Sequence, residues 1–113
     1  MRSVSVQIQP ERAPDLNVAA LTEVFAAIAK DSALVRHHAF AQGHDYHNFT
    51  FGTTRAADLW REIQRRLFDN PLFGGPTRKA SIVVCSSESG WHDYLLLFHF
   101  DPAVKVDSDA TLD

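Results

Sequence analysis

Hydrophobic and polar residues alternate at the start of the chain, as they do in a half-buried β-strand. Val4, Val6 and Ile8 are separated by serine and glutamine residues, and successive side chains of a strand point to opposite faces of its sheet. Pro10 and Pro14 follow and bracket a predicted turn. The chain therefore begins with a predicted strand that turns its apolar face toward a core.

Two later segments have apolar residues at the spacing of amphipathic helices. In the first segment the apolar stripe consists of Val18, Leu21, Val24, Phe25 and Ile28. In the second it consists of Ala56, Leu59, Trp60, Ile63 and Leu67. Asp15 or Asn17 is the expected N-cap of the first helix, and Thr53 or Thr54 that of the second. The pattern predicts two helices that each bury one face.

Alternation returns in two other regions and predicts two hairpins. In the region from Val35 to Thr53, Gly43 lies at the expected turn. With an even number of loop residues, one face of this hairpin carries His38, Phe40, Phe49 and Phe51. The second hairpin joins segment 82–85 to segment 91–100, which has apolar residues on both faces. Such a strand is expected to be central, or to be an edge strand covered by a second subunit.

The predicted order is strand, helix, strand, strand, helix, strand, strand, with residues 70–76 as a loop rich in proline and glycine. This order predicts an α+β fold with two helices on one face of a mostly antiparallel five-stranded sheet. The first six elements match the ferredoxin-like split βαβ order, with one strand added. Residues 1–113 are expected to form a single domain, in which residues 102–113 are a frayed acidic tail. The order of the strands within the sheet does not follow from the pattern.

The composition is that of a globular protein, with 45% hydrophobic and 22% charged residues. No stretch approaches the roughly 20 apolar residues of a membrane span, so no membrane partner is expected. Cys85 is the only cysteine, and the first residues lack the apolar run of a signal peptide, which together predict a cytoplasmic protein. The net charge of −3 and the scattered basic residues argue against a nucleic-acid partner.

Acidic residues are concentrated in the last part of the chain. Between Glu88 and Asp113 there are six acidic residues and a single basic residue, Lys105. A solvated tail is the simplest interpretation of this run. The alternative is an acidic surface that steers a cationic partner toward the protein.

Histidines suggest metal binding or acid–base chemistry, and the chain has six of them. His44 and His47 flank a predicted turn, where they would be able to share a metal ion. His37 and His38 are adjacent on a predicted strand, so they point to opposite faces and do not chelate one ion together. No metal site and no cofactor is predicted.

Cys85 suggests a second kind of chemistry. If the last hairpin has a four-residue turn from Ser87 to Gly90, Cys85 faces His92, and a thiol opposite an imidazole can be activated as a thiolate. An orienting group and an oxyanion site cannot be placed from the sequence, and a cysteine in a strand is more often a small buried hydrophobic residue. No catalytic residue is assigned.

With weak signals for chemistry, the leading prediction is a non-catalytic protein-binding module. One form of it is an inhibitor, or an immunity-type protein that neutralises a basic toxin. Trp91 beside a glycine turn is a candidate aromatic anchor, and the acidic residues around it suit a cationic partner. The predicted partner-binding residues are Glu88, Trp91, His92, Asp93 and Asp101.

Two alternatives remain open. The first is a small-ligand pocket, or a histidine-dependent active site of a ferredoxin-like dimeric enzyme, between the sheet and the helices. The residues predicted for that pocket are His38, Phe40, His47, Phe49 and Tyr94. The second is a homodimeric scaffold in which Leu95 and Leu97 lie in the subunit interface.

Overall fold

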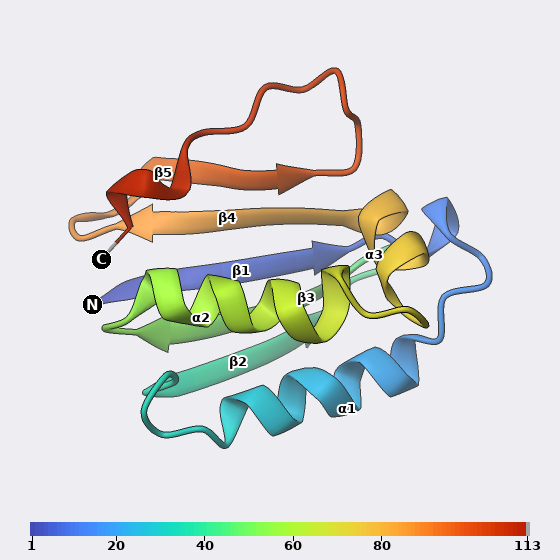
Figure 1. Cartoon of the computed structure of the whole chain (residues 1–113), viewed down its shortest axis with the longest axis horizontal. Helices are drawn as coiled ribbons and strands as arrows, with labels where there is room; N and C mark the ends of the chain where they lie inside the picture. The colour runs from blue at the N-terminus through green and yellow to red at the C-terminus, as the bar shows by residue number, and fades with distance from the viewer. Residues whose placement is uncertain (113) are drawn as a thin grey trace.

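Five strands form one antiparallel sheet in the computed structural model, which describes residues 1–112 (Figure 1). The strands are β1 (Arg2–Ile8), β2 (His37–Gln42), β3 (His47–Thr53), β4 (Ser81–Ser87) and β5 (Gly90–His99). Their order in the sheet is β2-β3-β1-β4-β5, so β1 is central and β2 and β5 are the edges. The predicted five-stranded antiparallel sheet and α+β class are confirmed.

Three α-helices accompany the sheet, one more than predicted. They are α1 (Val18–Ala29), α2 (Ala56–Ile63) and α3 (Gly74–Ala80). Shorter helical turns are η1 (Pro10–Arg12), η2 (Gln64–Phe68) and η3 (Asp109–Thr111). Figure 1 shows α1 and α2 on the same side of the sheet. Within the described residues, no helix is both long enough and apolar enough to cross a membrane.

Helix α3 begins inside the predicted loop of residues 70–76, so that prediction was wrong for residues 74–76, whereas residues 70–73 form no helix or strand. Gly74, Gly75 and Pro76 form its first turn, where backbone N–H groups have no intrahelical acceptor and a proline therefore removes no hydrogen bond. A Cβ atom on Gly74 would lie 2.4 Å from the carbonyl oxygen of Phe68. Glycine is thus required for the close approach of α3 to η2, and it does not mark a loop here.

The core lies between the sheet and the two longer helices. All three apolar residues of the first strand, Val4, Val6 and Ile8, are fully buried. Phe25 of α1 stacks on Phe49 of β3, with 4.2 Å between the ring centroids. The second predicted apolar stripe, from Ala56 to Leu67, is confirmed as buried, although its last member, Leu67, lies in η2 beyond the end of α2. This burial of apolar surface is the main force that holds the helices on the sheet.

The helix N-termini show which capping predictions were right. The side chain of Asn17 accepts a hydrogen bond from the N–H of Ala20 at 3.0 Å, which confirms Asn17 as N-cap of α1. The N-cap of α2 is Arg55 instead of a threonine. The hydroxyl of Thr53 instead accepts a hydrogen bond from the N–H of Arg55 at 2.9 Å, just before the helix begins.

The two edge strands of the sheet differ in whether another part of the chain forms hydrogen bonds with them. β5 is an edge strand, and the C-terminal segment runs beside it (Figure 1). The N–H of Asp107 donates to the carbonyl of Leu96 at 2.8 Å, and the N–H of Leu96 donates to the carboxylate of Asp107 at 2.8 Å. The chain therefore satisfies part of the β5 edge itself. β2 lies at the opposite edge, and all six of its residues are exposed.

Candidate protein-binding surface

A bulge in β5 shapes the surface at the β4–β5 hairpin. Ser87 pairs with Gly90, whereas Cys85 pairs with Leu95, so four residues of β5 lie opposite Ser86 alone. A bulge of this kind pushes the longer strand outward and changes the direction of its side chains. All four bulged residues, Trp91 to Tyr94, are exposed.

The same register overturns the predicted pairing of Cys85 with His92. The turn of the hairpin has two residues, Glu88 and Ser89, instead of four, and it places Cys85 opposite Leu95. The thiol is fully buried, whereas His92 is exposed. Cys85 is therefore a small buried core residue, and a thiol–imidazole pair does not form.

Two aromatic side chains stand out on the bulge. Trp91 is 45% exposed and Tyr94 is 55% exposed. Among the described residues, neither ring stacks against another aromatic ring. Large aromatic side chains that are left in solvent are the usual anchors of protein–protein interfaces. We call the residues Glu88, Trp91, His92, Asp93 and Tyr94 the hairpin patch.

The two acidic residues of the hairpin patch have different surroundings. Glu88 forms ion pairs with the N-terminal amino group of Met1 at 3.2 Å and with Nε of Arg2 at 3.6 Å. Asp93 is exposed and forms no ion pair within the part of the chain that the structure describes. Asp93 is therefore the carboxylate of the hairpin patch that is available to an external cation, because Glu88 already pairs with Met1 and Arg2.

The structure brings four of the five predicted partner-binding residues together and separates the fifth. Asp101 follows the far end of β5, which runs from Gly90 to His99. Its carboxylate accepts a hydrogen bond from the N–H of Ala103 at 2.9 Å and so stabilises a local turn. Tyr94, which was predicted to line a pocket, lies in the hairpin patch. Its exposure has no sequence signal, because regular alternation puts it on one face with Leu96.

The residues predicted for the ligand pocket are also only partly assembled. A shallow hollow of about 260 Å³ lies beside β2 and is lined by Thr22, Phe40, Ala41, Gln42, His47 and Phe49. His38 is next to Phe40, with 5.1 Å between the ring centroids. Tyr94 is on β5, at the opposite edge of the sheet. The hollow is smaller than most ligand pockets, which range from about 300 to 1,000 Å³.

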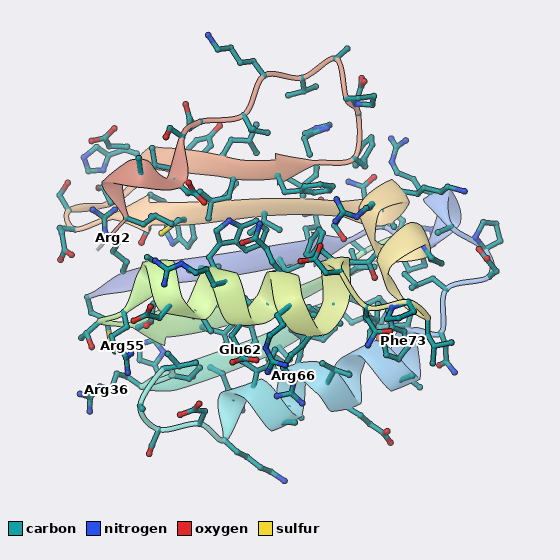
Figure 2. All side chains as sticks on the ribbon, viewed as in Figure 1. Arg2, Arg36, Arg55, Glu62, Arg66 and Phe73 are labelled. Atoms are coloured by element: carbon teal, nitrogen blue, oxygen red, sulfur yellow. The ribbon has the colours of Figure 1, made fainter. Side chains whose placement is uncertain are left out.

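Charged residues form a separate network along α2. The carboxylate of Asp58 pairs with Arg55 at 2.8 Å and with Arg61 at 2.6 Å. The hydrogen bond from Arg55 is the largest cause that lowers the pKa of Asp58 below its ordinary value. Figure 2 shows Arg55 at one end of α2 and Glu62 further along it. Within the described residues, no group of three histidine, cysteine, aspartate or glutamate side chains is arranged to hold a metal ion.

The fold and the hairpin patch define a small α+β protein with an exposed aromatic surface at one end of its sheet. Comparisons with protein-family models, curated proteins and solved structures find no match to this chain.

Proposed function

We propose that this protein is a non-catalytic protein-binding module and that the hairpin patch is its binding surface. The bulge in β5 is the observation that supports this most, because it holds Trp91 and Tyr94 in solvent within four residues of each other. Leaving two large aromatic side chains in solvent forgoes the favourable free energy that their burial would contribute. A partner that covers them would recover that free energy.

The partner that suits this surface is a basic protein. Asp93 forms no ion pair among the described residues, and the chain as a whole carries a charge of −3. Opposite charges speed association and exclude wrong partners. A small acidic inhibitor, such as an immunity-type protein that neutralises a basic toxin, has these properties.

The finer description of the fold and the location also belong to the proposal. The antiparallel order β2-β3-β1-β4, in which α1 connects β1 to β2, supports a ferredoxin-like unit to which β5 is added. The single cysteine, which is buried, supports a cytoplasmic location, because a reducing compartment does not require disulfides.

The experiment that tests this function is affinity capture from the lysate of the organism that encodes the chain. The wild type should retain one stoichiometric basic protein. The variant in which Trp91 and Tyr94 are both changed to alanine should lose it, and Asp93→Lys should weaken retention. Leu72→Ala is the matched control, because Leu72 is 81% exposed and lies outside the hairpin patch. Glu88 is a poor choice, since a change there also breaks its ion pairs with the N-terminus.

The outcomes test the hairpin patch and the protein-binding class separately. If the double variant retains as much partner as Leu72→Ala does, the hairpin patch is not the binding surface. A column that retains no stoichiometric protein would refute the protein-binding class itself. In each case circular dichroism must first show that the variant keeps the wild-type fold.

A further inference from the structure

The β2 edge lacks several features with which proteins usually protect an edge strand. Its sequence from His37 to Gln42 contains no lysine, arginine, aspartate, glutamate or proline. Its pairing with β3 is continuous, without a bulge. The β5 edge, in contrast, has register shifts and a bound C-terminal segment. An exposed and regular edge strand without these residues is a template for another strand.

The backbone groups available at this edge can be assigned. The N–H of Gly43 donates to the carbonyl of Tyr46 at 2.9 Å, in the register that pairs Gln42 with His47. Hydrogen-bonded and non-bonded pairs alternate along an antiparallel ladder. The backbone groups of residues 37, 39 and 41 therefore point toward β3, and those of residues 38, 40 and 42 point away from the sheet.

We infer that β2 pairs with β2 of a second copy of this chain, antiparallel and across a two-fold axis at Phe40. In this register residue 38 of each copy faces residue 42 of the other. The outward groups then form about six backbone hydrogen bonds across the axis. The interface is self-complementary, as a two-fold axis requires, and the two sheets join into one.

The side chains at the axis fit such a pairing. Phe40 is 36% exposed, and its ring makes T-shaped contacts with Phe49 and Phe51 at centroid distances of 5.0 and 5.7 Å. Across the axis, each Phe40 would lie beside the other and cover the hollow next to β2. Thr22 of α1 borders this hollow, and Ala26 follows it by one helical turn. These small side chains allow the α1 helices of the two copies to pass close together.

Charge complementarity favours a second copy over an unrelated strand. Arg36 precedes β2 and extends into solvent (Figure 2), and Asp45 lies in the turn that follows β2. Neither residue makes an ion pair within the described chain. Antiparallel pairing centred on Phe40 brings Arg36 of each copy opposite His44 and beside Asp45 of the other. The two-fold axis thus produces this contact between opposite charges twice.

The test is sedimentation equilibrium over a concentration series, with charge-reversal variants. The wild type should form a dimer, and Arg36→Glu or Asp45→Arg should each weaken self-association by about tenfold, because two attractive contacts become repulsive. An equimolar mixture of the two variants should form a heterodimer of about wild-type strength, since both contacts are attractive again. Lys105→Glu is the control, an exposed change in the C-terminal segment, and it should leave the dimer unchanged.

Each result decides for or against the β2 interface. A wild-type chain that stays monomeric throughout the series would overturn the inference, and so would a dimer that neither charge reversal weakens. If each variant alone is weakened and the equimolar mixture associates again, the pairing of Arg36 with Asp45 across the axis is established. Misfolded variants would not complement each other in this way. Phe40→Asp, measured with circular dichroism as a check of folding, should abolish the dimer. If the monomeric chain instead captures a partner through Phe40, the edge belongs to a different protein.

Discussion

Two neighbouring glycines of α3 give a sharp test of how this helix packs. A Cβ atom added to Gly74 would lie 2.4 Å from the carbonyl oxygen of Phe68, whereas one added to Gly75 would meet nothing within 4 Å. The clashing atom belongs to the backbone, so no side chain can rotate away from it. Moreover, Nε of Arg78 already donates a hydrogen bond to this carbonyl at 3.1 Å. Gly74→Ala must therefore displace α3 from η2.

The expected difference in the free energy of unfolding follows from these contacts. Overpacking destabilises a protein by about 1–3 kcal/mol, and the higher helix propensity of alanine offsets up to about 1 kcal/mol of it. Gly74→Ala should thus lower the free energy of unfolding by about 1–2 kcal/mol. Gly75→Ala has no clash to offset its gain and should stabilise the protein by about 0.5–1 kcal/mol. For a domain of this size, 1 kcal/mol shifts the melting temperature by about 4 °C.

Thermal and urea unfolding of the two variants and the wild type provide the assay. The two melting temperatures should move in opposite directions and differ by about 8 °C. Equal stability of both variants would refute the close approach of α3 to Phe68. A large loss in both would show that neither glycine lies in the first turn of a helix as described.

Two further predictions follow from the same structure. Cys85 is fully buried, so a thiol reagent should modify it only after unfolding in urea; rapid modification of the native protein would contradict its place in the core. The pKa of Asp58 is lowered, first by the hydrogen bond from Arg55, so this residue stabilises the fold above its ordinary pKa and the contribution disappears as the pH falls through the lowered value. Asp58→Asn should therefore reduce the loss of stability between about pH 5 and pH 3, as measured by urea midpoints; an unchanged pH profile would show that the pair with Arg55 does not form in solution.

Regular periodicity in the sequence predicted most of the fold, and irregular backbone caused the errors. The stripe from Ala56 to Leu67 and the alternation from Val4 to Ile8 each describe one repeated environment, and both are buried as expected. The sequence predicted a loop over residues 70–76 because glycine and proline usually end helices, yet α3 begins at Gly74. Here they occupy a helix start that must approach another carbonyl closely. The need for glycine at position 74 depends on the nearby carbonyl of Phe68, and no local sequence pattern reveals that contact.

The candidate site was predictable in its residue types but not in its geometry. Trp91, His92 and Asp93 were identified because an aromatic residue follows a glycine turn beside acidic residues. The bulge that exposes them depends on the pairing of Cys85 with Leu95, and alternation alone cannot reveal an extra set of residues in one strand. The homodimer alternative placed Leu97 in a subunit interface, whereas this residue is buried in the core of its own chain.

The positions of the two proposed interfaces determine what a dimer would be able to do. β2 and β5 are opposite edges of the sheet, so a dimer through β2 would place its two hairpin patches at the far ends of the joined sheet. Each patch would then bind its partner without obstruction by the other copy. Such a dimer would therefore gain avidity only for a partner that presents two sites across the full width of the joined sheet. A single basic partner should bind the charge-reversal variants at Arg36 and Asp45 as tightly as it binds the wild type.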